Sequence, residues 1–317
     1  MKNKGFRFAV IAVAGCLIAA VPGFAASDSQ AGDGQAVITV LPEKNIAPAP
    51  INAQDLSVKV NGKASKITSL APLQGPNNKV ELVMLIDDDA RSSLGNQMND
   101  IANFLKSLPP NTAATVGYMQ NGRTVLAGPF TKDHDQIAKG LHLPLSVPQV
   151  NASPYLSLSE LAKNWPSHDT DARREVVMVT DGVDYYDPHY DPYDPYVQSA
   201  VNDAVKAHII VYSIYWLNTG RYDRTFAGNN DGQNLLLMVT GATGGNSYWI
   251  GTGNPVSLIP FLDDVKQRLN NQYELGFMAP PDARPGVATF KVKVDNKTKI
   301  DAPQQVLVNG NPAGSER

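Results

Sequence analysis

The stretch Val80-Glu-Leu-Val-Met-Leu-Ile86, followed directly by Asp87-Asp88-Asp89, decides the fold predicted for this chain. The first seven residues are almost all apolar and mostly branched, and the run is too short for an independent helix. Such a run is typical of a strand covered on both faces, as in a parallel sheet. In an open α/β sheet, ligands bind beyond the carboxyl ends of the strands, so the three aspartates mark a candidate site. A helix with one apolar face is predicted next, from residues three or four apart: Leu94, Met98, Ile101, Leu105 and Leu108.

Beyond Lys79 the sequence alternates between strand-like and helix-like segments. The predicted strands are 80–86, 114–119, 124–127, 175–180, 209–216 and 247–250. The predicted helices after the first are 132–141 (capped by Thr131), 156–165, 197–208, 232–240 and 256–271. This alternation predicts βαβ units and hence an α/β fold class, a doubly wound, mostly parallel sheet with helices on both faces, plus small flanking β segments.

The flanks have strand patterns of their own. Val58 and Val60 alternate with polar residues before the turn pair Asn61-Gly62. Other predicted flanking strands are 36–41, 273–278, 288–294 and 305–308. The predicted organisation is a signal peptide (1–26), a linker and small N-terminal β module (27–78), an α/β domain (79–272), a C-terminal β segment (273–308) and a polar tail (309–317).

The N-terminus has the pattern of a secretory signal. Basic residues precede an apolar segment from Phe8 to Val21, and small residues near Ala25 and Ala26 suit cleavage. A membrane-spanning helix needs about 20 uninterrupted apolar residues, and Pro22-Gly23 interrupts this segment sooner. We therefore expect an exported protein that is periplasmic, secreted or on the cell surface, with no transmembrane span after cleavage.

Cys16 is the single cysteine of the chain. Val13-Ala-Gly-Cys16 matches the lipoprotein pattern, but apolar residues rather than a polar tether follow it, so cleavage near Ala26 is favoured over lipid anchoring. The mature chain would then contain no cysteine and form no disulfide. It would have 24 basic and 30 acidic residues, a formal net charge of −6, which argues against nucleic acid as a partner.

Two strand ends carry a family resemblance. Leu85-Ile86-Asp87 before an amphipathic helix, and Val179-Thr180-Asp181-Gly182 at a later strand end, resemble the von Willebrand factor A-type (vWA) domain over roughly residues 79–272. The flanks Asp55-Leu-Ser-Val-Lys-Val-Asn-Gly62 and Tyr273-Glu-Leu-Gly-Phe277 look like those of exported bacterial proteins that carry this domain. The resemblance implies a metal-ion-dependent adhesion site that usually holds Mg²⁺ through oxygen ligands and binds an acidic residue of a partner.

Carried over by position, the resemblance implies Asp87 and Asp181 as metal ligands, with Asp89 in place of the first motif serine. The middle-loop threonine of the family has no clean match here, and Ser153 or Ser157 is the nearest candidate. Arg91 occupies the second serine position, and a guanidinium donates hydrogen bonds but accepts none. The site is therefore degenerate. Two interpretations are open: a divalent cation such as Mg²⁺, or an internal ion-pair cluster with Arg91 as the cation. The second is favoured, so no cofactor is required.

The segment Asp184-Tyr-Tyr-Asp-Pro-His-Tyr-Asp-Pro-Tyr-Asp-Pro-Tyr196 follows the later aspartate. Tyrosine offers a large contact area at a low cost in conformational entropy, which suits a recognition surface. A series of Asp-Pro turns that packs on its own domain is the equal alternative. The predicted contact residues are Tyr185, Tyr186, Tyr190, Tyr193 and Tyr196, with Arg221 and Tyr222 after the next strand, where they meet an acidic partner or neutralise the nearby carboxylates.

Enzyme signatures are absent: the sequence has no Gly-x-Ser-x-Gly elbow, no phosphate loop and no His-Glu-x-x-His. The predicted function is an exported, non-catalytic module for protein–protein recognition or adhesion, working through the carboxyl edge of the sheet. Its partner would be an unidentified protein outside the cytoplasm. The main alternative is a structural or scaffolding component of a bacterial envelope assembly without metal, and a metal-assisted hydrolase is a distant third.

Overall fold

The computed structural model describes residues 32–42, 48–75, 78–90, 92–145, 153–186, 190–217, 226–251, 253–295 and 298–310 of the 317-residue chain. The predicted signal peptide, the lipidation motif at Cys16 and Arg91 lie outside these residues. In the part that is described, no helix is both long and apolar enough to cross a membrane.

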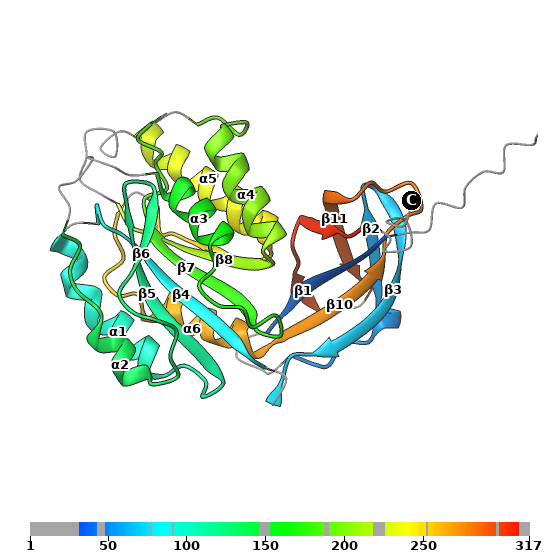
Figure 1. Cartoon of the computed structure of the whole chain (residues 1–317), viewed down its shortest axis with the longest axis horizontal. Helices are drawn as coiled ribbons and strands as arrows, with labels where there is room; N and C mark the ends of the chain where they lie inside the picture. The colour runs from blue at the N-terminus through cyan, green and yellow to red at the C-terminus, as the bar shows by residue number, and fades with distance from the viewer. Residues whose placement is uncertain are drawn as a thin grey trace, which may run out of the picture.

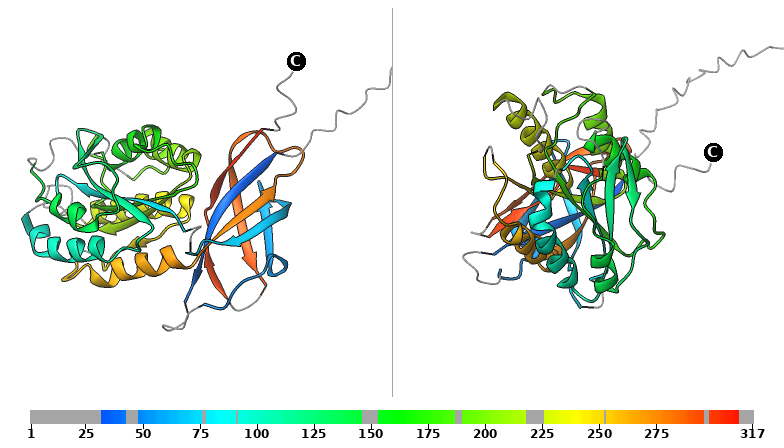
Figure 2. Two further views of the ribbon diagram at one scale, coloured as in Figure 1. Left: turned by 60° about the horizontal axis from the view of Figure 1, so that its bottom comes forward. Right: turned by 90° about the vertical axis from the view of Figure 1, so that its left-hand side faces the viewer.

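The chain forms two β-sheets, one layered with helices and one closed on itself (Figures 1 and 2). The described helices are α1 (Met98–Lys106), α2 (His134–Lys139), α3 (Pro154–Lys163), α4 (Pro195–Lys206), α5 (Phe226–Thr243) and α6 (Ile259–Asn270), with two 3-10 helices, η1 (Ala53–Asp55) and η3 (Ser92–Gln97).

The first sheet has six strands. In spatial order they are β6 (Arg123–Leu126), β5 (Thr112–Gln120), β4 (Val80–Asp87), β7 (Arg173–Thr180), β8 (Ile209–Tyr215) and β9 (Ser247–Tyr248). Strands β5, β4, β7, β8 and β9 run parallel, while β6 is antiparallel to β5, so the sheet is mixed. The φ angles of 53° at Asn121 and 67° at Gly122 suit the tight turn between β5 and β6.

Both faces of this sheet are covered (Figure 1). Leu82, Met84 and Ile86 of β4 pack in one core with α1, α2 and α6, and Val83 and Leu85 pack in another with α3, α4 and α5. All eight residues of β4 are buried. This explains why β4 lacks the alternation of polar and apolar residues found in a half-exposed strand.

The second sheet is a closed antiparallel barrel. Its strands are β1 (Asp33–Leu41), β2 (Leu56–Val60), β3 (Lys63–Pro72), β10 (Gln272–Met278), β11 (Gly286–Val294) and β13 (Gln305–Val308), with β12 (Lys299–Asp301) paired to β1. The order β10-β3-β2-β11-β13-β1 closes through pairing of β1 with β10, from Asp33 opposite Met278 to Thr39 opposite Gln272. The interior holds apolar side chains such as Ile38, Phe277 and Phe290.

The predicted fold class is therefore wrong for this chain. It treated the N- and C-terminal strands as small flanking segments of a doubly wound, mostly parallel α/β protein. Instead, residues 33–72 and 272–308 pair with each other as a barrel, and the helix-layered sheet inserted between them is mixed. Closure removes the unpaired strand edges that each flank would expose alone. Local sequence patterns carry no signal for a pairing between residues so far apart in the chain.

Two local expectations also change. The helix expected from Leu94 begins as the 3-10 helix η3 and becomes α-helical at Met98. The cap of α2 is Asp133 rather than Thr131, because the Asp133 carboxylate accepts a hydrogen bond from the Gln136 amide at 3.1 Å.

The barrel packs against the edge where the parallel strands begin. Arg268 of α6 forms ion pairs of 2.6 Å with Asp264 and with Asp301 of β12. At a second contact, the Gln304 amide donates to the Gly241 carbonyl at 3.0 Å. The carboxyl ends of the strands consequently lie at the opposite edge, away from the barrel (Figure 1).

Candidate functional site: the carboxyl edge of the mixed sheet

Asp87 ends β4 at the carboxyl edge and is 1% exposed. Its Oδ1 accepts a hydrogen bond from the backbone amide of Asp89 at 3.0 Å, and its Oδ2 accepts one from the Thr180 hydroxyl at 2.7 Å. The Thr180 hydroxyl in turn accepts a hydrogen bond from the amide of Gly182 at 3.2 Å. The Asp87 carboxylate therefore joins the ends of β4 and β7.

Burial raises the pKa of Asp87 from 3.8 to about 7. Loss of hydration is the largest cause, and the negative charges of Asp89 and Asp88 raise the pKa further. The hydrogen bonds from Thr180 and from the Asp89 amide stabilise the charged form and act in the opposite direction. Near neutral pH, Asp87 is therefore divided between its protonated and charged forms.

The segment after β7 is anchored to the start of α3. The carboxylate of Asp181 accepts hydrogen bonds from the Val183 amide at 2.9 Å and the Tyr185 hydroxyl at 3.1 Å. The Ser153 hydroxyl caps α3 and also donates to Asp184 Oδ2 at 2.8 Å. Buried Tyr155 donates its hydroxyl to the Gly182 carbonyl at 2.6 Å. These bonds give the segment a fixed path over the edge.

The metal ligands implied by the family resemblance all have protein partners in this arrangement. Ser153 is bonded to Asp184, while Asp87 and Asp181 accept the bonds given above. Within the described ranges, no three His, Cys, Asp or Glu side chains are grouped so that they could hold a metal ion. The described residues therefore offer no ready set of oxygen ligands for Mg²⁺, and the metal site implied by the resemblance stays a prediction.

Several tyrosines are exposed on residues 185–196. Tyr193 is 84% and Tyr186 57% exposed, and Tyr190 and Tyr196 are also exposed, whereas Tyr185 is half-buried with its hydroxyl on Asp181. The rings of Tyr186 and Tyr196 lie 6.2 Å apart between centroids. Four of the five predicted contact tyrosines in this segment therefore present aromatic surface to solvent.

The aspartates of the repeated Asp-Pro-Tyr units hold the backbone. Asp191 Oδ1 accepts a hydrogen bond from the Tyr193 amide at 2.8 Å, which forms a tight local turn. Asp194 Oδ1 accepts bonds from the amides of Tyr196 at 2.7 Å and Val197 at 3.0 Å, and so caps α4. The turn interpretation and the contact interpretation are therefore compatible, because the aspartates make the turns while the tyrosines stay exposed.

Sequence reasoning missed other residues at this edge. Thr180, which bridges the two strands, was hidden in the apolar run before Asp181. Asp88 was predicted only as a member of the aspartate cluster, without a role; it accepts hydrogen bonds from the Leu145 amide at 2.9 Å and Gln120 Nε2 at 3.1 Å. Exposed apolar side chains adjoin these strand ends, with Leu145 76% and Val256 94% exposed, together with Trp249 and Ile250 after β9. Leu145, Val256, Trp249 and Ile250 belong to no sequence motif, so their exposure could not be predicted from the sequence. Arg221 and Tyr222 lie outside the described residues.

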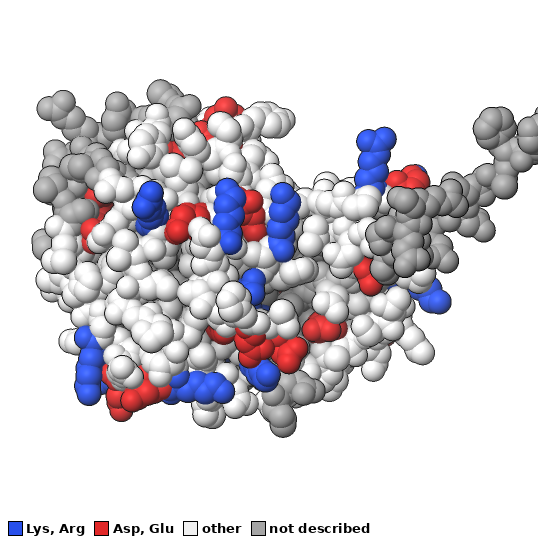
Figure 3. Space-filling view, in the orientation of Figure 1, with Lys and Arg blue, Asp and Glu red and all other residues white. Residues whose placement is uncertain are grey.

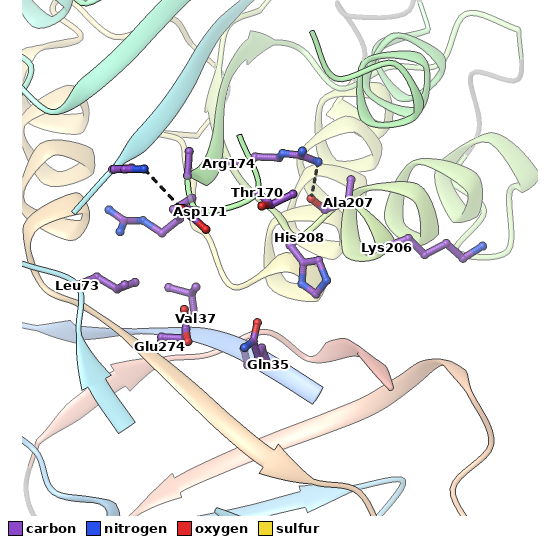
Figure 4. Close-up of a pocket in the computed structure, with 14 residues that line it drawn as sticks. Gln35, Val37, Leu73, Thr170, Asp171, Arg174, Lys206, Ala207, His208 and Glu274 are labelled. Carbon is purple, nitrogen blue, oxygen red and sulfur yellow. Dashed lines mark hydrogen bonds and ion pairs between the residues drawn. The ribbon is translucent and has the colours of Figure 1, made fainter. Parts of the chain in front are cut away.

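A cavity of about 280 Å³ lies at the other edge, between the barrel and the mixed sheet. In Figure 4, the labelled barrel residues Gln35, Val37 and Glu274 face Thr170, Asp171 and His208. Charged groups around it pair within the protein: Lys79 with Asp171 at 3.5 Å, and the Arg174 guanidinium with the Ala207 carbonyl at 3.3 Å. Both contacts lie within the mixed-sheet half and occupy charged groups of the cavity lining, so the carboxyl edge is the stronger candidate for a binding site.

No protein-family model matches the sequence, and no curated protein matches it. Similar solved structures include an aerotolerance-related membrane protein from Bacteroides fragilis, at 12% identity and a TM-score of 0.42, with 60% of this chain and 98% of that one covered. The conserved hypothetical protein BatB from Bacteroides thetaiotaomicron has 15% identity and a TM-score of 0.39, with 60% and 97% covered. The VWA domain of SpRpn10 has 10% identity and a TM-score of 0.35, with 58% and 94% covered. At these scores, the similarities carry no argument about function.

Proposed function

We propose that this protein binds another protein through the carboxyl edge of its mixed sheet. The binding surface would comprise Tyr186, Tyr190, Tyr193 and Tyr196, together with the exposed apolar side chains of Leu145, Trp249, Ile250 and Val256 near other strand ends of the same edge. The observation that carries the proposal is a row of exposed tyrosines on a backbone held by aspartate turns. Protein interfaces are enriched in tyrosine and tryptophan, and pre-ordered contact residues lose little entropy on binding.

In this proposal Asp87 and Asp181 support the surface and do no chemistry. Their carboxylates receive hydrogen bonds from the neighbouring strand end, from Val183 and from Tyr185, which holds the start of the tyrosine segment (residues 185–196). The protein would act outside the cytoplasm as a recognition or adhesion module, without enzymatic activity and without a required metal. Support for export comes from the N-terminal sequence pattern.

Capture of the partner from an extract of the producing cells tests the proposal. The bait would be the purified protein, compared with a variant carrying Tyr186→Ser, Tyr190→Ser and Tyr193→Ser. A matched control carries Leu237→Ser and Met278→Ser, because these apolar side chains are exposed on α5 and on β10 of the barrel, outside the proposed surface. Circular dichroism would verify that all three proteins are folded.

We expect a protein that is captured by the unchanged chain and by the control variant but is lost with the tyrosine variant. Equal capture by all three baits would remove the tyrosine segment as the binding surface. A partner that co-purifies in one fixed stoichiometry and does not exchange would favour the scaffolding alternative.

A further inference from the structure

The outer face of the barrel carries four lysines on three adjacent strands. Lys59 of β2 lies directly opposite Lys291 of β11, and Lys293, two residues further on β11, lies opposite Ser57. Lys66 of β3 follows Ser65, which is paired with Val58. All four side chains are exposed. Because alternate residues of a strand point to the same side, these lysines share one surface, which we call the lysine face.

The lysines of the lysine face are not neutralised by direct contacts, although exposed Asp295, two residues after Lys293, borders the face. None of its four lysines forms an ion pair with a carboxylate among the described residues, whereas neighbouring Lys63 pairs with Asp282. Like charges opposite each other across a strand pair destabilise a sheet. Positive and negative side chains are interspersed on the face of the mixed-sheet half seen in Figure 3. The lysine face is therefore a local positive surface on a chain whose formal net charge is negative, at −3.

Most of the lysine face lies on strands turned away from the mixed sheet. Strands β13 and β1 and, through Val287, the start of β11 contact the helices of the mixed sheet, whereas β2 and β3 are on the opposite side of the closed barrel (Figure 1). Lys291 and Lys293 lie further along β11 than Val287. The carboxyl edge points away from the barrel in the other direction. The two surfaces are therefore at opposite ends of the molecule, so binding at one leaves the other open.

We propose that the lysine face binds the anionic headgroups of a phospholipid membrane. Lysine is depleted in protein interfaces, and the outward positions next to these lysines are small or polar, as at Ser57, Ala64 and Thr289. A group of compact ammonium charges without an aromatic anchor suits a surface of many phosphates rather than one shaped partner. Bound in this way, the protein presents its tyrosine segment away from the membrane.

Vesicle sedimentation tests this inference. The full chain would be mixed with vesicles of equal parts phosphatidylglycerol and phosphatidylcholine, or of phosphatidylcholine alone. It would be compared with a variant carrying Lys59→Gln, Lys66→Gln, Lys291→Gln and Lys293→Gln. The matched control carries Lys106→Gln, Lys132→Gln, Lys139→Gln and Lys206→Gln, exposed lysines of the mixed-sheet half, and so has the same net charge. All proteins share the same N-terminus, so any lipid binding by its apolar segment is common to them.

We expect the unchanged chain and the control to bind the anionic vesicles, and salt to weaken that binding. The lysine-face variant should bind at least about tenfold more weakly, because each lysine near an anionic surface contributes to the attraction. Equal losses in both variants, or equal binding to neutral vesicles by every protein, would overturn the proposal. Binding to immobilised polyglutamate without binding to anionic vesicles would overturn it as well, and would assign the face to an acidic protein.

Discussion

The hydroxyl of Thr180, at the end of β7, donates a hydrogen bond of 2.7 Å to the carboxylate of Asp87, at the end of β4. Both residues are fully or almost fully buried. The bond joins two neighbouring parallel strands at the edge from which the tyrosine segment leaves. It also stabilises a carboxylate that burial would otherwise leave poorly solvated.

Replacing Thr180 with valine should destabilise the protein, because it removes this donor while keeping the shape of the side chain. We expect a loss of about 1–3 kcal/mol in the free energy of unfolding, measured in urea. The loss should be larger at pH 8 than at pH 5, since the charged carboxylate depends more on the bond. Thr115→Val is the control, because buried Thr115 donates to the neutral Gly128 carbonyl at 2.8 Å. If Thr180→Val lost the same unfolding free energy at pH 5 and at pH 8, as Thr115→Val is expected to do, this role of Thr180 would be contradicted.

Asp87 should make the protein less stable as the pH rises. Its pKa is about 7 in the folded chain and 3.8 ordinarily, so the folded state binds the proton more tightly than the unfolded state. Its contribution to stability is therefore complete below about pH 4 and is lost as the pH rises through 7, at most about 4 kcal/mol in total. Buried Glu175, whose pKa is also raised to about 7, acts in the same direction.

Asp87→Asn should consequently reduce the slope of stability against pH between pH 4 and 8. The asparagine variant gains stability relative to the unchanged chain at pH 8 but not at pH 4. Urea unfolding across this range measures the slope, with Asp135→Asn, at an exposed position of α2, as the control. The same slope in all three proteins would show that Asp87 does not titrate in this range.

Ser153→Ala should loosen the tyrosine segment. Ser153 caps α3 and donates to Asp184, so its loss removes two hydrogen bonds and should cost about 1–2 kcal/mol. Amide hydrogen exchange should become faster over residues 183–197 than elsewhere. Ser107→Ala, which removes the bond from Ser107 to the Phe104 carbonyl in α1, is the control. Uniformly faster exchange along the chain would mean that Ser153 supports global stability alone.

The residue ranges of most strands and helices of the mixed sheet could be predicted approximately, because the spacing of apolar residues reflects which side chains are buried. The barrel could not be predicted, because the pairing of Asp33 with Met278 depends on residues far apart in the chain. At the candidate site, the aspartates were visible as a cluster after an apolar run. The bridge through Thr180 was not, because a threonine in a buried strand fits an ordinary β-branched residue equally well.

The tyrosine segment shows another limit. Its composition alone left the turn and contact interpretations equal, and hydrogen bonds to Asp191 and Asp194 show that the turns form while Tyr193 stays exposed. The apolar neighbours Leu145 and Val256 were invisible to pattern analysis, because their exposure depends on how distant loops meet at one edge.

Photo-crosslinking in the producing cells tests the central claim most directly. A benzoylphenylalanine would replace Tyr193 in one variant and Met278, exposed on β10 of the barrel, in another. We expect a covalent adduct with one discrete protein from position 193 after irradiation, and none from position 278. No adduct at position 193, or the same adduct from both positions, would contradict the claim that the tyrosine segment is the binding surface.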